Sequence, residues 1–232
     1  MKINLITPED IATFDQIDRD CLRMHVCPPP KTFINMKVHM PNGELVHDLD
    51  MLSRSWVRHA YNVMACQFMA LNAAAGGGTF GAGKIAGKSI SGLVIGSGIL
   101  TIYDASHQIG GIGVDDRGIV IGTGNTAESF ESYTLVTRIL NGITATKMTH
   151  NAQSAATFSY DAGTKKATSI ASRIFNNNSG AQIDVKEVGW YVYDNPSSNP
   201  VMLSRDLLSP PVPVVNTAQL TVTYISEMTF PA

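Results

Sequence analysis

The residues best suited to phosphate chemistry lie in one glycine-rich stretch. Residues 76–81 satisfy the letters of the dinucleotide fingerprint, whose glycines let the backbone approach a pyrophosphate at a helix N-terminus. That fingerprint must follow a strand and open a helix, whereas these residues follow an expected helix. The P-loop pattern also fails, because Ile85 stands where Ser or Thr must hold magnesium after Lys84, and Ala82 replaces the glycine required before Lys88. The sequence therefore predicts no nucleotide hydrolysis.

Sulfur, imidazole and carboxylate side chains offer a second kind of chemistry. They lie close together in three places: Cys21, His25 and Cys27; Asp48 and Asp50; Asp115 and Asp116. The first group lacks the Cys-x-x-Cys elements of zinc sites, and the acidic pairs lack the pattern of a calcium loop. No serine or cysteine stands in a local nucleophile motif. We expect no metal, no cofactor and no catalytic site; a depolymerase with two carboxylates in one cleft is an alternative.

The charge of the chain limits its partners. Charged residues are 16% of the 232 residues, below the roughly 25% of typical soluble proteins, and the formal net charge is −2. Nucleic acid and anionic membranes favour clustered Lys and Arg, and the basic patch around Arg54 and Arg58 is too small for that. We expect neither partner. A surface with few charges suits a subunit covered by copies of itself or by other proteins.

Cysteine content and the first residues bear on the compartment. Three cysteines, Cys21, Cys27 and Cys66, are an odd and low number, which argues against a disulfide framework and favours a reduced compartment. Cys21 and Cys27 can still pair. The first ten residues lack the long apolar region and cleavage site of a signal peptide. We therefore expect no export by that route.

An N-terminal helical arm with a proline-rich spacer is predicted over residues 1–30. Thr7 can cap a helix that has Pro8 at its first position, and an apolar stripe continues to Cys21. The helix must end before the three prolines at 28–30, which favour an extended spacer. The arm is therefore expected to dock separately from the main body.

Residues 31–118 are expected to hold a hairpin, a helix and a glycine-rich region, all packed on the main β domain. Residues 34–46 alternate apolar and polar side chains around a Pro-Asn-Gly turn, which predicts the hairpin. Ser53 can cap a helix that runs to Leu71. That helix is apolar around much of its circumference, so we expect it to be buried.

Residues 119–232 are predicted to form the core, an antiparallel β-sandwich of a jelly-roll-like kind. Runs of β-branched and aromatic residues alternate with turn signals at a spacing typical of sandwiches and barrels. These signals lie at residues 122–125, 141–142, 161–163, 176–180 and 194–196. The expected fold class is therefore mainly β, with an N-terminal helical arm and one buried helix.

Residues 173–191 carry a pattern that resembles structural proteins of tailed bacteriophages. A strand from Arg173 meets an Asn-Ser-Gly turn ending at Gly180, and the chain returns through Glu187-Val188-Gly189-Trp190. Three further stretches resemble the same group: residues 53–62, 119–133 and 203–206. The resemblance implies a non-enzymatic virion subunit, assembled in the bacterial cytoplasm. Such a subunit would be a tail, fibre or baseplate component or a capsid decoration protein, with copies of itself and other virion proteins as partners.

The same pattern suggests assembly or turn positions. They are Arg173, Asn178, Gly180, Glu187, Gly189 and Trp190. We expect Asn178 or Gly180 to take a positive φ, Gly189 to mark a bulge or a close approach, and Glu187 to pair with Arg173 or Arg205 at the sheet edge. An alternative function is a receptor- or carbohydrate-binding module. Host glycan would then meet these residues: Trp190, Tyr191, Tyr193 or residues 195–199.

Overall fold

The protein is mainly β, with mixed and antiparallel sheets and one long helix. The computed structural model describes residues 1–58, 60–61, 83–85, 88–90, 109–193 and 200–230. Its elements, in chain order, are β1 (Lys2–Asn4), α1 (Pro8–Arg23), β2 (Lys31–His39), β3 (Leu45–Leu52), β4 (Gly83–Ile85), β5 (Lys88–Ile90), β6 (Gly118–Gly122), β7 (Thr149–His150), β8 (Thr157–Asp161), β9 (Lys166–Asn176), β10 (Ile183–Tyr193), β11 (Pro200–Val214) and β12 (Gln219–Thr229).

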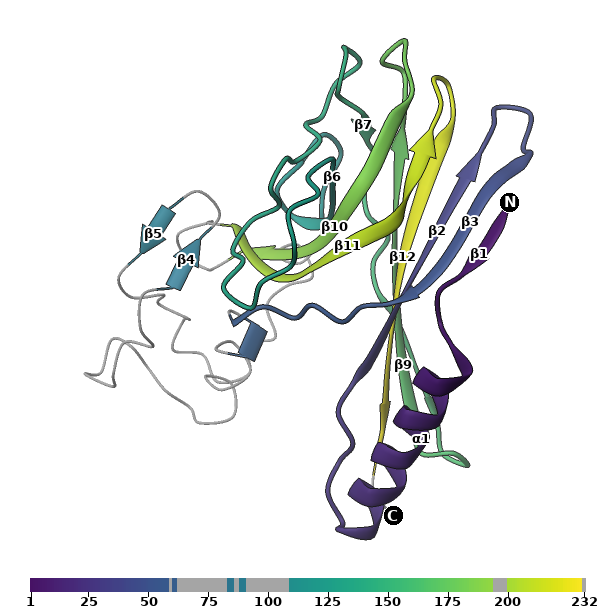
Figure 1. The fold of residues 1–232 in the computed structure, drawn as a ribbon, viewed down its shortest axis with the longest axis vertical. Helices are drawn as coiled ribbons and strands as arrows, with labels where there is room; N and C mark the ends of the chain where they lie inside the picture. Colours follow the sequence, from purple (N-terminus) through teal and green to yellow (C-terminus); the bar gives the residue numbers. More distant parts are fainter. Residues whose placement is uncertain (59, 62–82, 86–87, 91–108, 194–199, 231–232) are drawn as a thin grey trace.

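Two sheets organise the chain (Figure 1). The large sheet has the order β1-β3-β2-β12-β9-β7, and β8 also pairs with β9. It is mixed because β1 runs parallel to β3, while its other pairs are antiparallel. The second sheet has the order β11-β10-β6 and is antiparallel. Strands β4 and β5 form a separate small hairpin.

The predicted hairpin is present as β2 and β3. Side chains of β2 alternate between half-buried and buried along its whole length, as the period-2 sequence pattern requires. Gly43 takes φ +84° in the turn, a backbone region that favours glycine. The hairpin is not packed on the main domain, however: β2 pairs with β12, so residues 31–52 and the C-terminal strands belong to one sheet.

The main apolar core lies between the two sheets. Side chains from β2, β3, β9 and β12 meet side chains from β6, β10 and β11. Trp190 of β10 contacts Tyr224 of β12 edge-on, with ring centroids 5.0 Å apart. Burial on this scale is the dominant favourable term in folding, so the two sheets stabilise each other.

The opposite face of the three-stranded sheet is covered by residues 124–137, which follow β6 and which we call the covering segment. Leu135 from this covering segment packs with Tyr191 and Met202. Gly189 lies beneath it, and a Cβ there would come within 2.9 Å of the Ser204 carbonyl oxygen. The close approach expected at this glycine is therefore present, and the ladder between β10 and β11 shifts register on both sides of it.

The N-terminal arm joins the main body, contrary to the expectation that it docks separately. Thr7 caps α1 in a capping box with Asp10, as its position before Pro8 predicts. Before the helix, β1 adds to the large sheet beside β3. The backbone hydrogen bonds of β1 thus fix the arm to the edge of the sheet, a long-range pairing with no local sequence signal.

The second predicted helix lies mostly outside the described residues. Arg58, Ala60 and Tyr61 are helical, and the rest of the segment to Leu71 is not described. Ser53 does not act as its cap, because it lies five residues before Arg58, the first helical residue, and its hydroxyl instead donates to Asp206. Among the described elements, no helix is both long and apolar enough to span a membrane.

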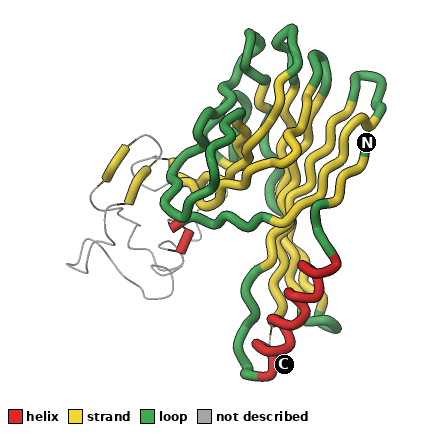
Figure 2. Tube along the Cα trace, viewed as in Figure 1, coloured by secondary structure: helices red, strands yellow, loops and turns green. Residues whose placement is uncertain are grey.

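The large sheet continues past the three-stranded sheet (Figures 1 and 2). We call this part the sheet extension: β8 with residues 31–33, 166–171 and 225–229. Helix α1 runs alongside it and is held by an ion pair between Asp18 and Lys31, whose nearest atoms are 2.6 Å apart. The extension therefore has a helix on one face.

Candidate assembly surface

Strand β8 forms an open edge of the sheet extension. In the part of the chain that the structure describes, β8 pairs with β9 alone. All five of its residues are exposed, including Phe158 at 73% and Tyr160 at 53%. Edge strands in natural proteins are usually guarded by Lys, Pro or a bulge, because unpaired backbone groups recruit other strands. The sequence Thr-Phe-Ser-Tyr-Asp contains no Lys or Pro, and its ladder has no register shift.

The β8 aromatic side chains lie on the face of the extension opposite α1. Phe158 is paired with Ser169 and Tyr160 with Ala167, and paired residues point to the same face. Lys31 is aligned through Glu227 of β12 with Thr168 of β9. Thr168 lies between Ala167 and Ser169, and successive residues of a strand point to opposite faces, so Lys31 and the helix that it binds lie on the other face. The ring of Phe230 joins the cluster 6.0 Å from that of Tyr160. We call Phe158, Tyr160 and Phe230 the β8 aromatic patch.

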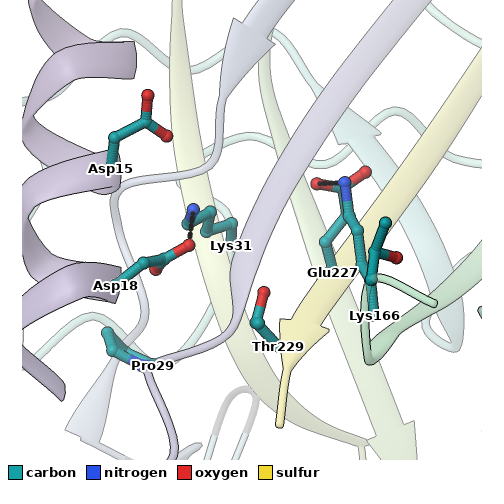
Figure 3. Close-up of a pocket in the computed structure, with 8 residues that line it drawn as sticks. Asp15, Asp18, Pro29, Lys31, Lys166, Glu227 and Thr229 are labelled. Carbon is teal, nitrogen blue, oxygen red and sulfur yellow. Dashed lines mark hydrogen bonds and ion pairs between the residues drawn. The ribbon is translucent and has the colours of Figure 1, made fainter. Parts of the chain in front are cut away.

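A polar cavity of about 230 Å³ lies between α1 and the end of the extension (Figure 3). Its lining is largely charged or hydroxylated: Asp15, Asp18, Pro29, Lys31, Thr164, Lys166, Glu227 and Thr229. Lys166 contacts Glu227 at 2.6 Å, across from the Asp18–Lys31 pair. Two of the three carboxylates are thus bound to lysines. The Asp18–Lys31 pair joins the arm to the sheet, whereas the Lys166–Glu227 pair joins two strands of the sheet.

Arg173 lies inside the protein, so it is not an assembly contact. Its side chain is 0% exposed and donates to five backbone carbonyl oxygens. These belong to Gly111, Val114, Arg117, Ile119 and Asn151. Burial lowers the pKa of the guanidinium to about 10, although nearby Asp115 and Asp116 oppose the shift. Arg173 therefore organises the loop before β6 as a hub of hydrogen bonds.

Glu187 pairs with Arg205, one of its two expected partners, but the pair is buried in the interior. The Arg205 Nε to Glu187 oxygen distance is 2.7 Å, and the two side chains are 2% and 0% exposed. Glu187 also accepts hydrogen bonds from the backbone N–H groups of Gly124, Val136 and Thr137. Because both side chains are buried and Glu187 accepts from the covering segment, the pair fastens that segment and offers no surface for a partner.

Two further buried ionisable groups were not singled out by the sequence. Asp206 accepts hydrogen bonds from the Ser53 hydroxyl and the Arg54 backbone N–H, which ties the chain after β3 to β11. Burial raises the pKa of Asp206 to about 6, although these hydrogen bonds oppose the shift. His150 is packed edge-on against Phe175, and burial lowers its pKa to about 4. Neither group lies in a described cavity.

The turn between β9 and β10 has its positive φ at Gly180, one of the two expected positions. Gly180 takes φ +87°, whereas Asn178 is exposed and is not among the residues with positive φ. The residue that organises the turn is Asn177, which is 0% exposed and donates to the carbonyls of Ala181 and Val214. Sequence reasoning missed it because three consecutive asparagines carry no signal that distinguishes one from the next.

The aromatic residues considered for glycan binding have contacts within the chain. Tyr191 is 0% exposed, and its hydroxyl accepts from the Leu135 backbone N–H at 2.7 Å. Trp190 packs in the core against Tyr224. The Arg117 guanidinium carbon lies 3.7 Å from the ring centroid of Tyr193, so it covers one face of this ring. Residues 195–199 lie outside the described residues.

The candidate metal ligands are not brought together. Across the described ranges, no group of three His, Cys, Asp or Glu side chains is arranged to hold a metal ion. Cys21 and Cys27 are free thiols, and the Cys27 sulfur donates to the Thr229 carbonyl oxygen at 3.3 Å. Asp48 and Asp50 each accept a hydrogen bond from the Asn35 amide.

Comparison with known proteins gives no relative. No protein-family model, no curated protein and no solved structure matches the chain.

Proposed function

We propose that this chain is a non-enzymatic structural subunit of a tailed bacteriophage virion, which assembles with copies of itself and attaches to the tail or capsid. The observation that carries the proposal is the open β8 edge with its exposed aromatic side chains. Exposed apolar side chains on an unguarded strand edge favour association with another chain. The buried Arg173, Glu187 and Arg205 serve the chain's own backbone, which supports a role in shape.

In this proposal the two sheets form a sandwich of a jelly-roll-like kind that acts as a rigid scaffold. The N-terminal arm supplies a second contact surface, because α1 has no buried residue and exposes Ile11 at 52%. A subunit with two separate contact surfaces can bind its own copies with one and a tail or capsid protein with the other. The phage assignment itself comes from the motif resemblance in residues 173–191.

The test is whether the chain is present in virus particles. Particles purified from the bacterial culture that produces the chain should contain its peptides by mass spectrometry, at several copies per particle. Antibody labelling in the electron microscope should place it on the tail or the capsid. Purified particles without the chain, together with a free chain that stays monomeric, would contradict the proposal.

A further inference from the structure

The sequence around β8 is nearly symmetric about Ser159. Residues at equal distances on either side of it are similar in size or polarity. The matched pairs, from the centre outward, are Phe158 with Tyr160, Thr157 with Asp161, Ala156 with Ala162, Ala155 with Gly163 and Ser154 with Thr164. When two identical strands pair antiparallel about a two-fold axis, residues equally distant from the axis lie opposite each other. This segment is therefore suited to face a second copy of itself.

We propose that β8 pairs antiparallel with β8 of a second copy, about a two-fold axis at Ser159. The inference rests on the self-assembly part of the proposed function. Phe158 would lie opposite the partner's Tyr160, and all four rings would gather on one face of a continuous sheet. Cross-strand aromatic pairs contribute about 0.2–1 kcal/mol each beyond a pair of alanines.

Charge favours the same register. Asp161 would lie opposite the partner's Thr157, so the two Asp161 carboxylates are not placed face to face. Each Asp161 also accepts its own backbone hydrogen bond from Gly163, which keeps its side chain in the turn. Like charges directly opposite in a ladder are destabilising, and this register avoids them.

The size of the contact sets the expected affinity. Five paired residues per copy, with the β8 aromatic patch, make an interface below the roughly 1,200 Å² that marks the low end of stable complexes. We therefore expect a reversible dimer with a dissociation constant on the order of micromolar. In a particle, contacts through other surfaces would add to this weak junction.

The first test compares two single substitutions. Phe158→Lys places a charge in the proposed junction, while Ile112→Lys changes a side chain of matched exposure, 80%, in a loop outside the extension. Sedimentation equilibrium should show a concentration-dependent dimer for the wild type and Ile112→Lys, and at least tenfold weaker association for Phe158→Lys. Equal association of both variants, or a wild type that is monomeric at its highest soluble concentration, would overturn the inference.

The second test reports the register. Opposite residues of antiparallel strands have Cα atoms about 4.5–5.5 Å apart, within the range that a disulfide spans. Ser159→Cys should therefore give a covalent dimer on mild oxidation, with a 159-to-159 bond identified by peptide mass spectrometry. Ser154→Cys, five residues from the axis, should not link to its own copy. A covalent dimer linked only through the native cysteines, or no bond at residue 159, would overturn the pairing.

The two proposals can fail separately. A wild-type chain that is present in particles and assembles equally well with Phe158→Lys would retain the virion role and refute the β8 junction. A chain that forms the 159-to-159 bond but is missing from particles would retain the junction and refute the virion role.

Discussion

Arg173 shows how one side chain can organise a loop that has little regular structure. All of its hydrogen bonds run to backbone carbonyl oxygens between residues 111 and 151. A guanidinium has five donors in a fixed fork, whereas a lysine has three donors on a single nitrogen. The geometry of this loop therefore requires arginine. Gly110 packs directly on the guanidinium, where a Cβ would come within 2.4 Å of an Arg173 nitrogen.

Replacing Arg173 with alanine should destabilise the protein strongly. The change leaves several buried carbonyl oxygens without a donor, and each costs about 1–3 kcal/mol. We expect a loss of more than about 3 kcal/mol in the free energy of unfolding, measured by urea titration. Guanidinium ion at low millimolar concentration should restore part of this loss in the variant and none in the wild type.

Arg54→Ala is the matched control for that experiment. Its guanidinium forms an ion pair with Asp10 at 2.8 Å, but its side chain is 61% exposed. Exposed pairs contribute at most about 1 kcal/mol, so this variant should remain close to the wild type and should not respond to guanidinium. Similar losses for Arg173→Ala and Arg54→Ala would contradict the hub role.

Asp206 should make stability depend on pH in a known direction. Its folded pKa of about 6 exceeds its ordinary value of 3.8, so the folded state binds the proton more tightly. Stability relative to Asp206→Asn should therefore be greatest below about pH 4 and fall as the pH rises through 6. The full difference is about 3 kcal/mol. His150 shifts the wild type in the opposite sense, but it is common to both proteins and cancels.

Urea titrations of the wild type and Asp206→Asn between about pH 4 and pH 7 would measure this difference. The wild type should lose stability relative to the variant as the pH rises, and the difference should level off above the folded pKa. A difference that stays constant over this range, or that changes in the opposite direction, would show that Asp206 is not a buried acid with a raised pKa.

At the scale of elements, α1 depends on its cap more than on burial. Thr7 and Asp10 satisfy each other's backbone N–H groups, and the helix has no buried residue. Thr7→Ala should destabilise α1 by about 1 kcal/mol and speed amide exchange in residues 9–23 by several-fold. Exchange in β12 should be unchanged, because that strand is paired on both sides.

Thr13→Ala provides a control within the same helix. Thr13 is exposed and lies in the helix interior, where alanine is the more favourable residue. Exchange in α1 should then slow slightly. Faster exchange throughout the protein with Thr7→Ala would instead show that α1 supports the whole fold.

Elements with local signals were predictable, and long-range pairings were not. The helix start at Thr7, the hairpin turn at Gly43 and the turn ending at Gly180 follow from cap and turn chemistry within a few residues. The pairing of β1 with β3 and of β2 with β12 joins segments far apart in the chain. No local pattern specifies those neighbours, so the sequence wrongly separated the arm and the hairpin from the main body.

The same limit applies to the buried charges. Arg173 and Glu187 were singled out by motif, yet both were assigned to assembly or to a sheet edge, and both lie in the interior. Their burial depends on loops that fold over them from residues 110–137. Strand β8 was predictable from the turn at Asp161. Its aromatic side chains are exposed because the three-stranded sheet does not cover the extension, which no local pattern predicts.

At the scale of the molecule, the two main sheets and the covering segment form three layers within the described residues. The large sheet packs on the three-stranded sheet, and the covering segment packs on the far side of the latter. The first interface is apolar, whereas the second also contains the Glu187–Arg205 pair. Glu187 accepts hydrogen bonds from the backbone N–H groups of Gly124 and Thr137, so it holds both ends of the covering segment. Arg205 donates to the carbonyl oxygens of residues 126 and 127 near the first of these ends.

A double-mutant cycle on Glu187 and Arg205 tests whether their ion pair holds the covering segment in place. Glu187→Gln and Arg205→Gln should each cost about 3–5 kcal/mol, since each leaves the other charge buried and unpaired. The double variant should cost clearly less than the sum of the two, with a coupling above about 1 kcal/mol. Urea unfolding gives the energies, and amide exchange should rise first in residues 124–137. Additive losses would mean that the two side chains act independently, and that the ion pair as a unit does not hold the covering segment in place.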